Sequence, residues 1–197
     1  MVARQQHGFN YENYVINKFK LIKSENYLSK DDAYTIDNNG NTFPIQTKCI
    51  KFGSPIDLGS LDRNRNKSKD FALILGFWND GIIGKEIVDE HLLIINIDWW
   101  TDLFQAPNGF YEEINNFLKN ISNNKEDDDK WVTGYKEYEK VWKNSWKDFA
   151  LDFSEKWGQV YKERPILPRF KRDHKTQKRI QCAIPNKLFY KYFLRWA

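Results

Sequence analysis

The fold is decided by residues 30–51, KDDAYTIDNNGNTFPIQTKCIK. In the middle of this stretch, Asn38-Asn39-Gly40-Asn41 is a strong turn signal, since Asn and Gly tolerate the backbone angles of tight hairpins. The sequence therefore predicts a β-hairpin with strands over residues 33–37 and 42–51. Pro44 should lie near the start of the second strand or on a sheet edge, because proline cannot donate a hydrogen bond to a neighbouring strand.

Hydrophobic periodicity extends this assignment in both directions. Apolar residues at helical spacing predict an amphipathic helix over residues 8–23. The polar segment 52–70, which contains Gly and Pro, is interpreted as a loop. Its residues Asp57 and Asp62 could be extra metal ligands, but a loop position fits both better. Residues 71–78, FALILGFW, are nearly all apolar, as in a strand that is covered on both faces of a sheet. After a turn at 79–81, another buried strand is expected over residues 92–97.

The second half of the chain is expected to be mostly helical. Asp98 is placed to cap a short helix, and residues 111–121 predict a further one. Aromatic residues then recur every three or four positions over 135–157, which predicts one long helix whose aromatic stripe forms a core or a dimer interface. A strand over 179–184 and an aromatic tail complete the order. A helix, a group of strands and then helices predict an α+β protein, or a small mixed α/β sheet flanked by helices.

Composition is that of a single folded domain. The 197 residues are 41% hydrophobic and 16% aromatic, which is enough to bury a core. We divide the domain into a core motif region 8–97, a helical region 98–163 and a basic C-terminal segment 164–197. Cys49 and Cys182 allow one disulfide but no zinc pattern. With no signal peptide and no membrane-length apolar run, we expect a cytoplasmic protein; the Lys-, Asn- and Ile-rich composition suggests a bacterial or viral source.

The hairpin carries the residues that indicate chemistry. It brings an Asp pair close to Gln46-Thr47-Lys48 on the returning strand. Mg²⁺ prefers hard oxygen ligands, which the Asp32 carboxylate, the Gln46 side chain and the Thr47 carbonyl could supply. Lys48 should share a strand face with Gln46, because side chains alternate, and could orient a water molecule or neutralise a phosphate. This pattern favours Mg²⁺-dependent phosphodiester hydrolysis, with a 5′-phosphate and a 3′-hydroxyl as products.

At these residues the sequence resembles the PD-(D/E)XK nucleases, and among them the type II restriction endonucleases. Asp32 matches the family's metal-binding Asp, and Lys48 matches its catalytic Lys. Gln46 stands where most members have Asp or Glu, and Glu12 resembles the acid that many members carry on the first helix. The strand over 71–78 resembles the next core strand. The resemblance covers the first half of the chain and implies a restriction-endonuclease-like core.

Two positions of this motif leave alternatives open. The metal-binding Asp could be Asp31, Asp32 or Asp37, of which Asp32 fits the family pattern best and Asp37 also fits a turn role. The neutral Gln46 removes one negative charge from the site, and Glu12 could restore it.

Basic residues follow the motif and also concentrate near the C-terminus, although the net charge is only +4. Arg recognises guanine and Gln recognises adenine in the major groove, and both Arg and Lys anchor phosphates. Because the C-terminal segment lies between a proline and a strand, a β-ribbon or loop is expected to contact the DNA. The predicted DNA-contacting residues are Arg63, Arg65, Lys67, Arg169, Lys171, Arg172, Lys175, Gln177, Lys178, Arg179 and Gln181.

Other enzyme classes lack their motifs. The three His residues are scattered, and no phosphate-binding GxxxxGK[ST] or GxGxxG occurs, so no zinc site and no nucleotide cofactor are expected. The partner should be double-stranded DNA, cut either by a homodimer or by a monomer that acts twice. Three alternatives stay open: a nuclease-like DNA-binding module without catalysis, a repair or homing nuclease of the same fold, and an interaction protein that presents its aromatic surface.

Overall fold

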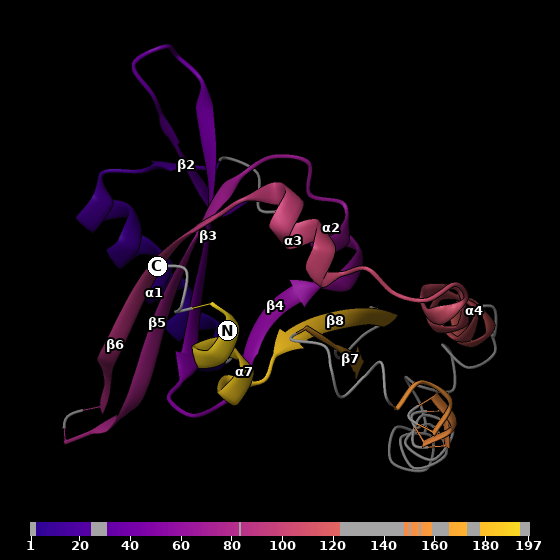
Figure 1. The fold of residues 1–197 in the computed structure, drawn as a ribbon. Coiled ribbons are helices and arrows are strands. Elements are labelled where there is room, and N and C mark those ends of the chain that lie inside the picture. Colours follow the sequence, from indigo (N-terminus) through magenta and orange to yellow (C-terminus); the bar gives the residue numbers. More distant parts are fainter. Residues whose placement is uncertain are drawn as a thin grey trace. The chain divides into compact units, whose positions relative to one another are not determined.

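A computed structural model describes residues 3–24, 31–82, 84–122, 148–149, 151–153, 155–158, 166–172 and 178–193 (Figure 1). Contacts divide the chain into two compact units. The first unit comprises Met1–Phe104, Pro165–Pro168 and Gln181–Ala197, and the second comprises Gln105–Arg164 and Arg169–Ile180. Among the described residues, no helix is both long enough and apolar enough to cross a membrane.

A mixed five-stranded sheet forms the centre of the first unit, in the order β1-β2-β3-β5-β6. Strands β3 and β5 run parallel, and each other neighbouring pair is antiparallel. The sequence prediction of an α+β fold with a mixed sheet flanked by helices is thus confirmed. The helix and strands involved are α1 (Ala3–Phe19), β1 (Ile22–Lys23), β2 (Ala33–Ile36), β3 (Thr42–Lys51), β5 (Phe71–Gly81) and β6 (Gly84–Ile95).

The predicted hairpin is present, but the helix before it is shorter at its C-terminal end than expected. Pro44 is the third residue of β3, and β5 pairs with β3 only from Ile45 onward, so the missing proline N–H interrupts no pairing with β5. The helix predicted over 8–23 ends at Phe19 because Lys20 has a positive φ of 53°. The chain then forms the short strand β1, which pairs with β2.

The segment predicted as a loop over 52–70 contains β4 (Ile56–Ser60) and α2 (Leu61–Arg65), so that prediction was wrong. Ile56 and Leu58 are buried on alternate positions of β4, and the Ser60 side chain accepts a hydrogen bond from Arg63 N at the start of α2. Strand β4 pairs antiparallel with β8 (Lys178–Ile184) in a second sheet, whose order is β4-β8-β7 with β7 at Leu167–Arg172.

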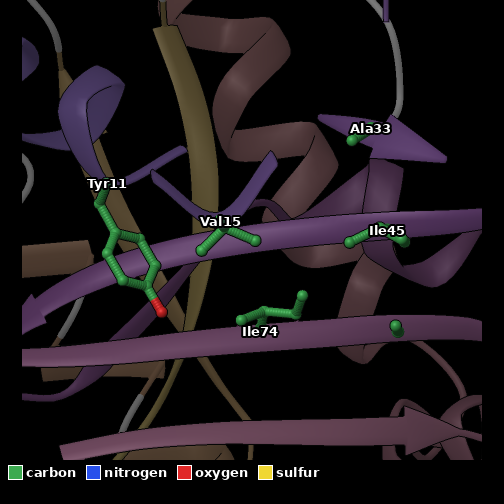
Figure 2. Close-up of a cluster of buried hydrophobic side chains, with 6 residues drawn as sticks. Tyr11, Val15, Ala33, Ile45 and Ile74 are labelled. Carbon is green, nitrogen blue, oxygen red and sulfur yellow. The ribbon is translucent and has the colours of Figure 1, made fainter. Parts of the chain in front are cut away.

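One face of the central sheet is covered by α1. The buried cluster on this face consists of Tyr11, Val15, Ala33, Ile45, Ala72 and Ile74. Figure 2 shows Tyr11 and Val15 lying over the strands that carry Ile45 and Ile74. Because side chains alternate along a strand, Gln46 and Lys48 belong to the opposite face of β3.

The opposite face carries Leu73, Leu75 and Phe77 of β5, all fully buried. The aromatic ring of Phe77 lies 5.8 Å, centroid to centroid, from Phe189 of α7 (Asn186–Tyr192), so this C-terminal helix packs on the sheet. The predicted aromatic tail is therefore helical and anchored. Both cysteines are free, so the disulfide that the sequence left open is absent.

The end of β6 and the helix after it differ from the prediction. Residues 92–97 were expected to form a buried strand, but Leu92 is 49% and Ile94 is 67% exposed. The reason is that only one face of β6 is covered here: Leu93 and Ile95 are buried, whereas Leu92 and Ile94 lie on the other face. Helix α3 (Ile97–Leu103) is capped by Asn96 rather than Asp98, because the Asn96 side chain accepts hydrogen bonds from the N–H groups of Asp98 and Trp99.

The described part of the second unit is organised around α4 (Phe110–Ser122), which the sequence placed at 111–121. Phe110 is fully buried and its ring lies 5.0 Å from that of Phe153, centroid to centroid. Most of the long helix predicted over 135–157 lies outside the described residues; the described part, from 148 onward, is helical and buries Phe153. This is the core role expected for the aromatic stripe.

Candidate active site

The pairing of β2 with β3 determines which side chains can meet. Ala33 pairs with Ile45, and the N–H of Asp32 donates to the carbonyl of Ile45 over 3.0 Å. Asp32 therefore stands across from Gln46 at the point where β2 begins. Since Ala33 and Ile45 face α1, alternation places Gln46 and Lys48 on the face away from that helix.

Asp32 and Lys48 form an acid–base pair that Thr47 holds together. The Asp32 Oδ2 atom accepts hydrogen bonds from Thr47 N over 2.7 Å and from Thr47 Oγ1 over 3.3 Å. The same oxygen lies 3.5 Å from Lys48 Nζ, which donates to the Thr47 carbonyl over 2.9 Å. The side chain of Asp32 is 31% exposed and that of Lys48 is 25% exposed, so both are anchored and both can be reached by a ligand.

The oxygen atoms around this pair fit a Mg²⁺ ion by their chemistry. Gln46, across from Asp32 in the strand register, is buried and carries an amide oxygen, and the carbonyl of the buried Thr47 accepts from the Lys48 ammonium group that lies 3.5 Å from Asp32 Oδ2. Within the described part of the chain, no group of three or more His, Cys, Asp or Glu side chains could hold a metal. Mg²⁺ in phosphoryl-transfer sites is held by only one or two carboxylates together with water and substrate phosphates, so a single carboxylate is compatible with it.

The other two Asp candidates have different partners. Asp31 Oδ1 lies 3.0 Å from Lys67 Nζ. Asp37 stabilises the hairpin turn by accepting hydrogen bonds from the Asn41 side chain and from the N–H groups of Asn39 and Asn41. These bonds, led by that from the Asn41 side chain, hold the pKa of Asp37 below its usual range. Of the three, only Asp32 contacts Lys48.

Glu12 lies on α1 and pairs with Lys23, the last residue of β1. Its Oε1 atom lies 3.2 Å from Lys23 Nζ, and Lys23 pairs with Ala33 across β1 and β2. The structure therefore brings Glu12 to the neighbouring strand, with one lysine between it and the segment that carries Asp32. The prediction that Glu12 supplies the missing carboxylate stays a prediction, since its printed partner is Lys23.

Two of the residues predicted to contact DNA have buried side chains in this structure. The Lys67 side chain is only 7% exposed, and its ammonium group lies 4.2 Å from the centroid of the Phe71 ring as well as against Asp31. Gln181 is buried in β8, where it pairs with Ser60. Gln181 is covered where β8 pairs with β4, and Lys67 lies against Asp31, a residue that is remote in sequence.

The other predicted DNA contacts are distributed over three elements. Arg63 is exposed and Arg65 half-buried on α2. Arg169, Lys171 and Arg172 lie in β7, and Lys178 and Arg179 lie in the neighbouring β8. Lys175 and Gln177 lie outside the described residues. The described members of this C-terminal set thus occupy adjacent strands.

Asp57, which the sequence analysis assigned to a loop, lies in a strand instead. It lies in β4, is half-buried and accepts a hydrogen bond from Gly59 N over 3.0 Å. Burial raises the pKa of the Cys182 thiol most, the Asp57 carboxylate raises it further, and the Lys48 ammonium lowers it. Asp57 and Lys48 therefore act on the same buried thiol. The alternation Ile56-Asp57-Leu58 was the only signal in the sequence for this strand.

Comparison with protein-family models, with curated protein sequences and with solved structures found no significant match.

Proposed function

We propose that this protein is a Mg²⁺-dependent endonuclease that cuts double-stranded DNA at specific sites, in the manner of a type II restriction enzyme with a PD-(D/E)XK core. The observation that carries the proposal is the pair formed by Asp32 and Lys48, 3.5 Å apart on one face of the hairpin. The first helix, the hairpin and the strand parallel to β3 supply the elements on which the resemblance depends.

Each residue of the site would have its own role in the reaction. When bound, Mg²⁺ would polarise a phosphate oxygen and lower the pKa of a water molecule. The Asp32 carboxylate, the Gln46 amide oxygen and the Thr47 carbonyl would hold it. Thr47 N–H orients the carboxylate through the 2.7 Å hydrogen bond. The Lys48 ammonium group can donate to the attacking water or to a phosphate oxygen, and this stabilises the charge that develops there.

A second candidate function is a DNA-binding module without catalysis. It is favoured by the neutral Gln46 and by the ion pair of Glu12 with Lys23, since among the described residues the carboxylate seen in contact with Lys48 is that of Asp32. Such a module would keep its affinity for DNA and show no Mg²⁺-dependent cleavage.

The test is a digest of plasmid and phage DNA by the wild-type protein, with Mg²⁺ or with EDTA. We expect discrete fragments in Mg²⁺ and none in EDTA, and fragment ends that a ligase can join because they carry a 5′-phosphate. DNA that is bound but uncut in both conditions would favour the binding module, whereas fragments formed only from branched or nicked substrates would favour a repair nuclease. Size-exclusion chromatography with light scattering would distinguish a homodimer from a monomer that acts twice.

A further inference from the structure

Lys67 is a buried cation that the proposed reaction does not use directly. It lies between α2 and β5, with a side chain that is 7% exposed. Its ammonium group contacts the Asp31 carboxylate at 3.0 Å and stands 4.2 Å from the centroid of the Phe71 ring. Lysine is rarely buried, and when it is, a charged partner normally accompanies it. Burial lowers the pKa of Lys67, while the hydrogen bond with Asp31 opposes this shift.

Lys67 also belongs to the electrostatic surroundings of the candidate site. The Lys48 ammonium lowers its pKa, and the Asp32 carboxylate raises it. Two acid–lysine pairs thus lie close together, one formed by Asp31 with Lys67 and the other by Asp32 with Lys48. Because Asp31 and Asp32 are consecutive residues, anything that fixes the first constrains the backbone of the second.

Two backbone hydrogen bonds hold Asp32 at the start of β2. Asp32 N donates to Ile45 O over 3.0 Å, and Asp32 O accepts from Ser24 N over 3.2 Å. The side chain of Asp31, the residue before Asp32, accepts a hydrogen bond from Lys67. The ion pair therefore connects the start of β2 to the segment that leads into β5.

We propose that Lys67 is a positioning residue, which holds Asp31 and thereby fixes the Asp32 carboxylate beside Lys48 in the orientation that a divalent cation needs. This inference rests on the proposed function, since it assigns Lys67 a role in the same site. It gives the buried lysine a task different from DNA contact: it acts through Asp31 and touches neither the substrate nor the metal.

The test compares Lys67→Met with the conservative Lys67→Arg. Metal binding is measured without DNA, by calorimetric titration with Mn²⁺, and the Mg²⁺ concentration for half-maximal cleavage is measured in parallel. We expect Lys67→Met to weaken Mn²⁺ binding and to raise the half-maximal Mg²⁺ concentration by about tenfold, the scale seen when outer partners of metal ligands are lost. Lys67→Arg should recover most of this loss, and cleavage at saturating Mg²⁺ should fall much less.

Controls separate positioning from a merely structural role. Lys51→Met removes a lysine of β3 whose partner, Asp80, is exposed. Because this pair does not touch the metal site, the variant should leave Mn²⁺ binding unchanged. Asp31→Asn combined with Lys67→Met should lose no more Mn²⁺ affinity than Lys67→Met alone, since both changes break one contact. If Lys67→Met does not fold, the comparison is made between Asp31→Asn and the wild type, with the same expected loss.

The outcomes are distinct. A folded Lys67→Met protein with wild-type Mn²⁺ affinity and wild-type Mg²⁺ dependence would overturn the inference and leave the proposed function standing. Equal weakening by Lys67→Met and Lys51→Met would also overturn it. A wild-type protein that neither binds Mn²⁺ nor cuts DNA would overturn the proposed function itself, and with it this role for Lys67.

Discussion

The Asp32 carboxylate has two tasks that a single substitution can separate. Its Oδ2 atom accepts from Thr47 N, and its negative charge faces Lys48. Asp32→Asn keeps an acceptor for Thr47 N and removes the charge, so we expect the free energy of unfolding to change by less than about 1 kcal/mol. Cleavage at fixed Mg²⁺ should fall by at least about a hundredfold, because even outer partners of metal ligands are worth ten- to a hundredfold. Cleavage rates and thermal unfolding measure both effects, and an Asn variant as active as the wild type would refute the assignment.

Cys49 provides a prediction about pH at the same scale. Burial raises the pKa of its thiol to about 11, from an ordinary value of 9.0, although Lys85 acts in the opposite direction. At pH 8 the native thiolate should therefore be about a hundredfold scarcer than in the unfolded chain, and a thiol reagent should label the native protein correspondingly slowly. Labelling of Cys49 as fast in the native protein as in urea would contradict this.

The same shift has a consequence for stability. The folded chain keeps the Cys49 proton up to about pH 11, whereas the unfolded chain loses it near pH 9.0. The unfolded state thus binds fewer protons in this window, so the contribution of Cys49 to stability is complete below pH 9.0 and is lost as the pH rises through about 11. Urea unfolding of the wild type and of Cys49→Ala between these pH values should show a steeper loss for the wild type.

Individual site residues were predictable from sequence where local geometry decides their position. The turn at Asn38–Asn41 fixes the hairpin register, and the register puts Asp32 across from Gln46 and next to Lys48. The burial of Lys67 and Gln181 was not predictable, because it depends on elements that are remote in sequence and cover these positions only in the folded chain. A charged or polar residue in a polar run looks the same in sequence whether it faces solvent or a partner.

At the scale of elements, the packing of α1 on β5 depends on Gly76. A Cβ atom at this position would lie 2.4 Å from Cε2 and Cζ of the Tyr11 ring, which is buried and hydrogen-bonded to Glu90. We expect Gly76→Ala to lower the free energy of unfolding by about 1–3 kcal/mol, because the ring cannot withdraw without displacing the core. Urea denaturation measures this loss.

Two further variants test the cause of that loss. Tyr11→Leu in the Gly76→Ala background should recover part of it, since the smaller side chain makes room for the added methyl group. Gly158→Ala, at a helical position with open space around it, should be neutral or stabilising. A Gly76→Ala protein as stable as the wild type would show that α1 does not pack on β5 as described.

The elements that the sequence predicted well are those with a strong pattern. The hairpin and the apolar strand from Phe71 were found, since alternation and a continuous apolar run are direct consequences of burial. Strand β4 and helix α2 were missed because each is five residues long and rich in polar and turn-forming residues. Their stability comes from pairing with β8 and from Asn64, whose buried side chain donates to the carbonyls of Leu58 and Ser60.

At the scale of the whole molecule, the sequence predicted one unit well and missed how the C-terminal segment is divided. The predicted helical region 98–163 largely coincides with the second unit, which includes residues 105–164. The basic segment 164–197 is divided between the two units, because β8 at Gln181–Ile184 pairs with β4. Such pairing closes a loop of more than a hundred residues and leaves no local signature in the sequence.

The net charge of +4 leads to a prediction about how salt affects DNA binding. If the protein binds the phosphate backbone, the logarithm of its affinity should fall linearly with the logarithm of the salt concentration, because binding releases counterions. Fluorescence anisotropy with a labelled duplex in EDTA, between about 50 and 200 mM NaCl, measures the slope. Absence of binding even at the lower salt concentration would favour an interaction protein over a nuclease or a DNA-binding module.

The most direct test of the central claim is a paired measurement of cleavage and DNA affinity for the wild type, Lys48→Ala and Lys51→Ala. Both lysines lie on β3, but Lys48 contacts Asp32 whereas Lys51 pairs with the exposed Asp80. We predict that Lys48→Ala loses cleavage by about a hundred- to a thousandfold, the typical cost of a missing charge-stabilising donor, while its affinity for DNA stays close to that of the wild type. Lys51→Ala should cut normally. Equal cleavage by Lys48→Ala and the wild type would contradict the claim that Asp32 and Lys48 form the active site.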